Sequence, residues 1–236
     1  MERQIVRFED LGRAAYAPVW DLQEKRLAEM VAVKKLENGL PPLARRTGHS
    51  LFFVEHDPVY TLGKSGHMEN LLLDSAGLQD KHISFFKINR GGDITFHGPG
   101  QLVGYPILDL EKLKTDIGWY LRSLEEVIIR TIADYGLKGE RSPGETGVWL
   151  EPSVPGRERK ICAMGVRCSR WVTMHGWALN VNTPLHYFDY IIPCGIQGKQ
   201  VTSIEKELGR QVDVEETKRI LLGHFEEVFG VEIQYL

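Results

Sequence analysis

The stretch Arg90-Gly91-Gly92-Asp93-Ile94-Thr95-Phe96-His97-Gly98-Pro99-Gly100-Gln101 carries the densest pattern in the sequence. Paired glycines let a backbone approach a ligand closely, because they lack the Cβ atom that would block it. Their N–H groups can form a cradle for an anion or an oxyanion. Arg90 could bind a carbonyl or a phosphate, and His97 could transfer a proton. The same two side chains could instead satisfy carbonyls in tight turns between strands, and the spacing alone leaves both interpretations open.

Outward from this loop, short apolar segments predict strands on both sides. We expect strands over residues 4–8, 50–55, 59–62, 84–89, 94–96, 102–108, 148–150, 161–168 and 173–182, with 59–62 as the neighbour of 50–55. Helices are expected over 16–37, after Asp116 as far as Gly136, and from Asp213 to Gly230. The order is not a regular alternation of strand and helix. It therefore predicts an α+β fold with a mixed or antiparallel sheet and flanking helices, in a single domain spanning residues 1–236.

The composition is that of a soluble globular protein, with 42% hydrophobic and 26% charged residues among 236 and a formal net charge of −3. No strongly basic footprint is present, so nucleic acid is not an expected partner. Arg157, Arg159 and Lys160 form a local basic cluster. No signal-peptide core begins the chain, and no apolar run approaches the ~18 residues of a membrane span. We expect a cytoplasmic protein without a membrane partner.

The cysteines number three, Cys162, Cys168 and Cys194, without a C-x-x-C pair. This pattern disfavours both a disulfide framework and a metal site. Cys162 and Cys168 stand an even distance apart in a strand-like segment, so both are expected on one face of that strand, in the core. Cys194 differs, because Pro193 and Gly195 place it in a turn after two isoleucines. That context favours an accessible thiol, although free cysteines are more often buried hydrophobic residues.

A nucleophilic thiol must lose its proton, which a neighbouring cation promotes. The candidate neighbours are Lys160, His97 and His175. Lys160 directly precedes an apolar strand and could be drawn partly inward, where a lysine can act as an acid and base. It could equally be a solvent-exposed lysine of a surface turn. Two nucleotide-binding patterns fail: Gly63-Lys64-Ser65 has a proline at the required upstream glycine position, and Gly98-x-Gly100 lacks the third glycine at its spacing.

Taken together, these motifs resemble the lipoyl(octanoyl) transferase family. The resemblance rests on the loop from Arg90 to Gln101 and on a second series: Lys160, Gly165-Val166, Met174-His175-Gly176, Ala178-Leu179-Asn180-Val181-Asn182, Phe188-Asp189 and Pro193-Cys194-Gly195-Ile196. It is clear from about Glu55 to Ile204. It implies the fold shared by lipoate and biotin protein ligases. Trp177 stands where the family often has another aromatic residue.

The resemblance also implies site residues and a reaction. Cys194 corresponds to the nucleophile, and Lys160 to the lysine paired with it. The acyl-binding segments correspond to Arg90, Gly91, Gly92, Asp93, Ile94, Thr95, Phe96 and His97, to Ala163, Met164 and Gly165, and to Gly176, Trp177 and Ala178. The implied reaction moves an octanoyl group from octanoyl-acyl carrier protein to a lysine of a lipoyl domain, without a cofactor, a metal or ATP. Backbone N–H groups near Gly92, Met164 or the Cys194 turn could hold the oxyanion.

The implied acceptors are the lipoyl domains of 2-oxoacid dehydrogenase complexes and the glycine cleavage H protein. Such partners are usually acidic, so Arg157, Arg159 and Lys64 could steer them. We expect a monomer. The alternatives are an ATP-dependent lipoate or biotin ligase, an amidotransferase between lipoyl-type proteins, a non-catalytic acyl-carrier binding module and a cysteine hydrolase. The Gly63-Lys64-Ser65-Gly66 loop is a candidate for movement over the acyl site.

Overall fold

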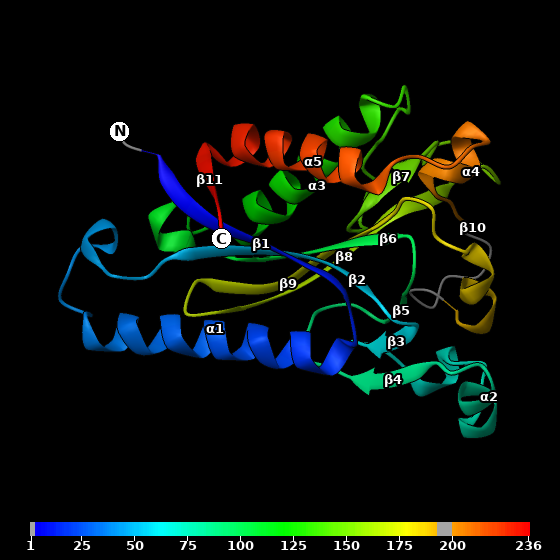
Figure 1. Cartoon of the computed structure of the whole chain (residues 1–236), viewed down its shortest axis with the longest axis horizontal. Coiled ribbons are helices and arrows are strands. Elements are labelled where there is room, and N and C mark those ends of the chain that lie inside the picture. Colours follow the sequence, from blue (N-terminus) through cyan, green and yellow to red (C-terminus); the bar gives the residue numbers. More distant parts are fainter. Residues whose placement is uncertain (1–2, 193–199) are drawn as a thin grey trace.

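A computed structural model describes residues 3–192 and 200–236 of the chain. Among these residues, eight strands form one sheet and three strands form a second, smaller sheet. The large sheet is mixed: β1 is parallel to β2 and β11, whereas β6 is antiparallel to β2 and β9. Helices cover both of its faces (Figure 1). The prediction of an α+β fold with a mixed sheet is therefore confirmed.

The large sheet has the strand order β10-β8-β9-β6-β2-β1-β11, and β7 also pairs with β8. Its strands are β1 (Gln4–Ala14), β2 (His49–His56), β6 (Gln101–Ile107), β7 (Val148–Leu150), β8 (Arg159–Ser169), β9 (Val172–Asn180), β10 (Gln200–Val201) and β11 (Val231–Tyr235). The small sheet has the order β4-β3-β5, with β3 (Val59–Leu62), β4 (Ser84–Lys87) and β5 (Ile94–His97).

The expectation that residues 59–62 pair with the strand before them is wrong. Both edges of β2 are already occupied, by β1 and β6. After β2 the chain therefore leaves the large sheet, and β3 pairs with β4 and β5 instead. This arrangement places a second layer of strands beside one end of the large sheet (Figure 1).

Three long helices flank the large sheet. α1 (Tyr16–Leu36) lies on one face, and α3 (Ile117–Ala133) and α5 (Val214–Phe229) lie on the other (Figure 1). The predicted caps form, because Asp116 accepts a hydrogen bond from the Trp119 N–H and Asp213 accepts one from the Glu215 N–H. The shorter helices are α2 (Ser75–Asp80), α4 (Ile204–Leu208) and four 3₁₀ turns, η1 (Pro42–Ala44), η2 (Met68–Asn70), η3 (Leu110–Lys112) and η4 (Leu185–Tyr190).

The core is divided by the sheet into two apolar clusters. One lies under α3 and α5 and includes Leu124, Phe225 and Trp177, and the other lies under α1 and includes Leu27 and Met30. Cys162 belongs to the first cluster, as expected. The prediction for Cys168 is wrong, because this thiol is exposed. Cys168 pairs with Thr173 close to the hairpin turn between β8 and β9, at the end of the sheet.

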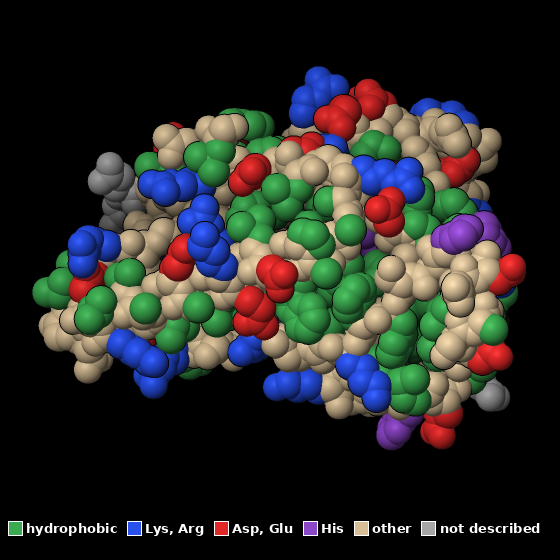
Figure 2. Space-filling view, turned by 60° about the horizontal axis from the view of Figure 1, so that its bottom comes forward, with side chains coloured by type: hydrophobic (Ala, Val, Ile, Leu, Met, Phe, Trp, Pro, Cys, Tyr) green, Lys and Arg blue, Asp and Glu red, His purple; other side chains and the backbone are tan. Residues whose placement is uncertain are grey.

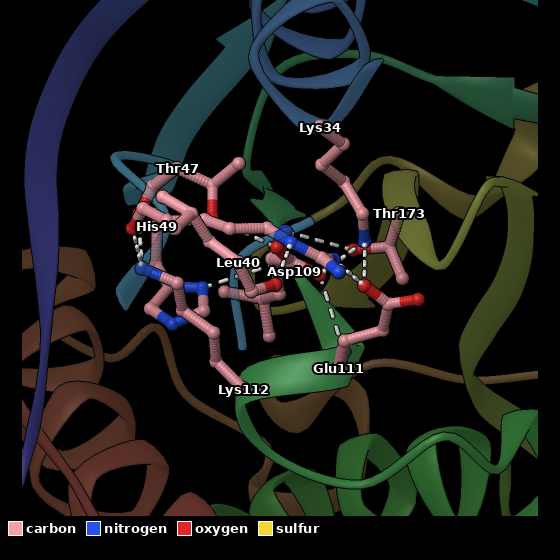
Figure 3. A network of polar contacts seen from close by, with 10 residues as sticks. Lys34, Leu40, Thr47, His49, Asp109, Glu111, Lys112 and Thr173 are labelled. Atoms are coloured by element: carbon pink, nitrogen blue, oxygen red, sulfur yellow. Dashed lines mark hydrogen bonds and ion pairs between the residues drawn. The ribbon is translucent and has the colours of Figure 1, made fainter. Parts of the chain in front are cut away.

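A buried ion pair fastens the C-terminal end of α1 to the segment after β6 (Figure 3). The Lys34 Nζ lies 2.6 Å from Asp109 Oδ1, and the two side chains are 6% and 0% exposed. Thr47 donates a hydrogen bond to Asp109 Oδ2, and the Asp109 N–H donates to His49 Nδ1. Because His49 accepts this bond in a buried place, its ring is neutral, and burial lowers its pKa to about 4.

Within residues 3–192 and 200–236, no helix is both long and apolar enough to cross a lipid bilayer.

Candidate active site

A cavity of about 180 Å³ lies where the small sheet and the loop before β5 face β6, β8 and β9. It collects most of the residues expected to bind the acyl chain. The predicted residues that line it are Arg90, Gly92, Asp93, Ile94, Thr95, His97, Lys160, Ala163, Met164, Gly165, Gly176, Trp177 and Ala178. Two predicted residues do not line it. The Gly91 N–H donates to Val166 O, and Phe96 is buried with its ring stacked on Tyr187.

The predicted nucleophile, Cys194, lies outside the described residues. The chain returns to the cavity directly after that segment, because Gln200 and Val201 line its wall. Lys160 lies beside them, since Val201 pairs with Lys160 in the parallel contact of β10 with β8. Gln200 is exposed and Lys160 is partly exposed, so this end of the cavity is its mouth.

Small residues form the floor of the cavity. Ala163 pairs with Ala178 across β8 and β9, and Gly165 pairs with Gly176 two positions along. Residues two apart on a strand face the same side, so all four present little more than backbone to the cavity. Gly165 has a second role, because a Cβ there would lie 2.8 Å from Gly91 O. The floor therefore leaves room for a flat apolar ligand and for the loop above it.

The loop from Arg90 to Asp93 is fixed from two sides. Arg90 is buried, and its Nη2 donates to both the carbonyl and the hydroxyl oxygen of Thr61 in β3. Backbone bonds join Gly63 to Asp93, Lys64 to Arg90 and Ser65 to Gly92. The 63–66 loop, a candidate for movement, is thus hydrogen-bonded to the acyl-site loop. Arg90 here binds a loop carbonyl, one of the options that the sequence left open.

Gly92 offers a hydrogen-bond donor to the cavity. Its φ of +89° lies in the left-handed region that favours glycine. Among the residues that the structure describes, none accepts a hydrogen bond from the Gly92 N–H, whereas the N–H of Gly91 is used by Val166. A cavity-lining N–H of this kind can hold a carbonyl oxygen or an oxyanion.

The side chain of Lys160 lies over an aromatic ring. Its Nζ is 4.6 Å from the centre of the Trp149 ring, and Trp149 is buried. Trp149 pairs with Lys160 across β7 and β8, so the register of these strands sets the contact. An ammonium over a tryptophan face is stabilised by the ring quadrupole. Neighbouring Arg159 points elsewhere, to ion pairs with Glu207 and Glu151.

Those ion pairs affect the predicted steering cluster. The carboxylates beside Arg159 raise its pKa further, and Arg159 in turn lowers the pKa of Glu207. Arg157 also contacts Glu151, at 3.0 Å. Much of the positive charge expected on this edge is therefore compensated within the chain.

A buried carboxylate supports the loop at the mouth. Glu125 of α3 has a fully buried side chain, and its Oε1 accepts a hydrogen bond from the Gly147 N–H. Arg122 and Arg141 pair with its Oε2. Burial raises the pKa of Glu125. The bond to Gly147 holds the end of the segment whose residues Glu145 and Thr146 line the cavity beside Lys160.

The inner end of the cavity is built from buried polar side chains. Tyr16 is 4% exposed, Tyr105 3% and His97 7%. The rings of Tyr16 and His97 are parallel, with centres 6.1 Å apart. His97 Nδ1 contacts Gln101 Oε1 at 2.9 Å, and His56 Nε2 contacts the Tyr105 hydroxyl at 2.8 Å. Burial lowers the pKa of His97 to about 3 and that of His56 to about 4, so both rings are neutral at pH 7.

His175 lines the cavity from an unusual backbone conformation. Its φ is +58° in the middle of β9, a conformation uncommon for a residue with a side chain. The His175 N–H donates to Gln23 Oε1, and its Nε2 contacts Asn89 Oδ1. Burial lowers its pKa to about 3. The helix α1 thus holds this residue against the cavity wall.

Sequence reasoning missed several lining residues, among them Tyr16, Tyr105, Trp149 and Phe188. They come from α1, β6, β7 and η4, far apart in the chain, and no local pattern connects them. The available signals were the place of Phe188 in the Phe188-Asp189 motif and the position of Trp149 in the strand before Lys160. Among the described residues, no group of three or more His, Cys, Asp or Glu side chains could hold a metal ion.

Comparison with known proteins finds close relatives. The family model of the lipoyl protein ligase A/B catalytic domain matches residues 16–226. An octanoyltransferase of Christiangramia forsetii is 57% identical over 98% of this chain and 98% of its own length. One of Flavobacterium johnsoniae is 56% identical over 97% and 98%. Among solved structures, the bipartite lipoate protein ligase of Thermoplasma acidophilum has a TM-score of 0.67 at 16% identity, over all of this chain and 87% of its own, which shows a common fold.

Proposed function

This chain belongs to the family of lipoyl protein ligase A/B catalytic domains and is an octanoyltransferase. We propose that it takes the octanoyl group from acyl carrier protein and passes it to a lipoyl-domain lysine through a thioester on Cys194. The observation that supports this route most is the cavity itself. Its floor is nearly free of side chains, and its mouth holds Lys160 beside the strand that follows Cys194 in the chain.

The cavity suits an apolar acyl chain. Ile94, Ala163, Met164, Ala178 and Phe188 all contribute apolar surface to it. Each methylene removed from water contributes about 0.8 kcal/mol, so a chain of octanoyl length can contribute several kcal/mol to binding. With the tail bound along the floor, the reacting carbonyl would lie at the mouth, near Lys160 and the Gly92 N–H.

In the first half-reaction, the Cys194 thiolate attacks the carbonyl carbon of the donor thioester. The Gly92 N–H would hold the oxygen that becomes negative, and one such donor is worth about 2.7–4 kcal/mol of barrier. The bond from the carbonyl carbon to the carrier sulfur then breaks. The carrier thiolate takes a proton from the Lys160 ammonium, which leaves Lys160 neutral and Cys194 acylated.

In the second half-reaction, the amine of the acceptor lysine attacks the Cys194 thioester. Neutral Lys160 accepts a proton from this amine, and Cys194 leaves as a thiolate. The products are the octanoylated lysine amide and the starting pair of ammonium and thiolate. Proton transfer by a positioned group typically contributes ~10²–10⁴-fold. No phosphate transfer is needed, because the conversion of a thioester and an amine into an amide and a thiol is already favourable in free energy.

We propose that the acceptors are lipoyl domains of 2-oxoacid dehydrogenase complexes and the glycine cleavage H protein. Lys64 is exposed, and Arg157 is 66% exposed despite its contact with Glu151. On the face in Figure 2, acidic and basic side chains are interspersed rather than gathered by sign. Steering by these cations should therefore be modest, and kcat/KM should fall only several-fold as salt rises from ~0.02 to ~0.5 M.

We further propose that residues 1–236 act as one catalytic domain, as a monomer in the cytoplasm. The family model covers residues 16–226, and β1 and β11 pair with each other in one sheet. The exposed free thiol of Cys168 suits a reducing compartment.

The test is intact mass after mixing the protein with octanoyl-acyl carrier protein, without ATP or acceptor. We expect one octanoyl adduct on the native protein, and its loss on adding an apo lipoyl domain. Cys194→Ala should give no adduct. Cys168→Ala, which removes the exposed thiol, is the matched control and should still be acylated.

Two outcomes would overturn the route. Octanoylation of the acceptor by Cys194→Ala at the native rate would exclude the Cys194 thioester. Transfer only with ATP and free octanoate, or only from an octanoylated lipoyl-type protein, would exclude acyl carrier protein as the donor and favour a ligase or an amidotransferase.

A further inference from the structure

The inner end of the acyl cavity contains two polar atoms without partners. One is the Tyr16 hydroxyl and the other is Nε2 of His97, and both residues line the cavity. Their side chains are more than nine-tenths buried. Among the described residues, neither atom makes a hydrogen bond, although the two rings stack on each other. The two residues are buried, but these two atoms are open to the cavity, where a bound group could complete their hydrogen bonds.

The hydrogen bonds of Gln101 determine what His97 offers. The Gln101 amide nitrogen donates to Phe96 O and to Asn180 Oδ1, so its Oε1 is an acceptor. His97 Nδ1, 2.9 Å from that oxygen, must therefore carry the proton. Because the ring is neutral, His97 Nε2 has a lone pair. The inner end of the cavity thus presents one acceptor, His97 Nε2, and one group that can both donate and accept, the Tyr16 hydroxyl.

The neighbouring polar pair behaves differently. His56 Nδ1 lies 2.9 Å from Ala14 O, which can only accept, so His56 Nε2 must accept the hydrogen bond of the Tyr105 hydroxyl. Tyr105 and His56 therefore satisfy each other, although Tyr105 also lines the cavity. Two tyrosines on one wall thus differ in one respect, since only the Tyr16 hydroxyl is available to a ligand.

The distance across the cavity determines how long an acyl chain must be to reach its inner end. From Lys160 on β8 the floor crosses β9 to Gln101 on β6, which pairs with Asn180 and contacts His97 Nδ1, and this crossing is two strand spacings, or about 10 Å. An extended octanoyl chain is of similar length. Its methyl end would therefore stop near Tyr16 and His97 without being able to bond to either. A chain longer by two atoms would place its last atom between them.

We propose that Tyr16 and His97 form a hydrogen-bonding subsite at the inner end of the acyl cavity, which accepts the terminal hydroxyl of an ω-hydroxyacyl chain slightly longer than octanoyl and rejects the methyl end of an alkyl chain of that length. The proposal rests on the proposed function, because it takes the acyl chain to lie along the floor of the cavity. It adds ω-hydroxyacyl thioesters to the donors, with the same bonds formed and broken at the carbonyl.

The physical reason is the cost of leaving both atoms unpaired. A hydroxyl can accept from Tyr16 and donate to His97 Nε2, or replace a water molecule that does so. A methyl group would displace such water and form no hydrogen bond with either atom. In an entirely apolar slot the methyl end would bind better than the hydroxyl end, since a buried hydroxyl without partners is unfavourable.

The test compares two donors of equal length, decanoyl- and ω-hydroxynonanoyl-acyl carrier protein, in transfer to an apo lipoyl domain. We expect the hydroxylated donor to have a kcat/KM about tenfold above that of decanoyl in the native protein. Tyr16→Phe should bring this ratio close to one. Tyr105→Phe is the matched control, since its hydroxyl already bonds to His56, and it should keep the native ratio.

A ratio at or below one in the native protein would overturn the proposal, and so would an unchanged ratio in Tyr16→Phe. The native ratio requires no variant, so a folding defect in Tyr16→Phe cannot hide the result. Octanoyl transfer and the Cys194 adduct are measured in the same mixtures. Their loss in the native protein would count against the proposed function, whereas normal octanoyl transfer with a ratio below one would count against this subsite alone.

Discussion

The Nζ of Lys160 lies over the ring of Trp149, 4.6 Å from its centre, and the pairing of β7 with β8 holds the two residues opposite each other. The contact restricts where the ammonium can lie. In the proposed mechanism this ammonium supplies the proton to the leaving carrier thiol. Trp149 is therefore a positioning residue for Lys160.

Replacing Trp149 by leucine should slow acylation of Cys194 by about five- to tenfold, because the aromatic face that positions the Lys160 ammonium is lost. Trp149→Phe retains an aromatic face and should lose less than threefold. Rapid-quench intact mass of the first half-reaction measures both rates. Equal losses in the two variants would mean that Trp149 acts only by filling space.

The floor of the cavity predicts how chain length is selected. Ala163→Leu would project a branched side chain over the position opposite Ala178, where the acyl tail is proposed to lie. We expect kcat/KM for octanoyl to fall at least tenfold, and that for butanoyl to fall much less. Competition between the two donors measures the change. Cys168→Leu, on the same strand but outside the cavity, should leave the preference unaltered.

The buried pair of Lys34 and Asp109 predicts a large effect on stability far from the cavity. Lys34→Met would leave the fully buried Asp109 carboxylate without its cation, which typically costs about 3–5 kcal/mol of unfolding free energy. The double variant Lys34→Met with Asp109→Leu should cost less than the single variant. Urea unfolding measures both. Arg13→Met is the control, because the Arg13–Asp57 pair is 55% exposed on each side and should change stability by less than about 1 kcal/mol.

The buried histidines predict that stability falls in acid. His49, His56, His97 and His175 have pKa values of about 3 to 4 in the folded chain, below the ordinary value of 6.5. The unfolded chain therefore binds more protons between these values, so their contribution is complete above pH 6.5 and is lost as the pH falls towards 4. Each histidine contributes up to about 1.4 kcal/mol per pH unit within that window.

Unfolding free energies at pH 7.5 and pH 5 measure this loss. His56→Gln should reduce the difference between the two pH values, because one of the four groups is removed. The exposed His67 offers a control, and His67→Gln should preserve the native difference. A difference that His56→Gln leaves unchanged would show that His56 is not neutral in the folded protein.

The strands and long helices could be predicted because their signals are local. The apolar run of β2, the cap at Asp116 and the glycine at position 230 each determine structure within a few residues. The pairing of β3 could not be predicted in this way. It depends on whether the edges of β2 are free, and those edges are occupied by β1 and by β6, which comes much later in the chain.

The site shows the same division. Lys160 and the loop from Arg90 were visible because each belongs to a compact motif. Tyr16 opens a helix that was predicted from the sequence, and its ring reaches the cavity only because α1 packs across β9 and β6. The exposure of Cys168 could not be predicted either. Strand periodicity predicts which face of the sheet a side chain lies on, but not where the elements that cover that face end.

Trp149 lines the mouth of the cavity, and its ring lies beneath the Nζ of Lys160. Indole emission responds to the polarity and the quenchers around the ring. An acyl group bound beside the Trp149 ring would therefore change the intrinsic fluorescence of the protein. The chain carries a built-in optical reporter of acyl loading, and the two half-reactions can be followed in a stopped-flow instrument without a label.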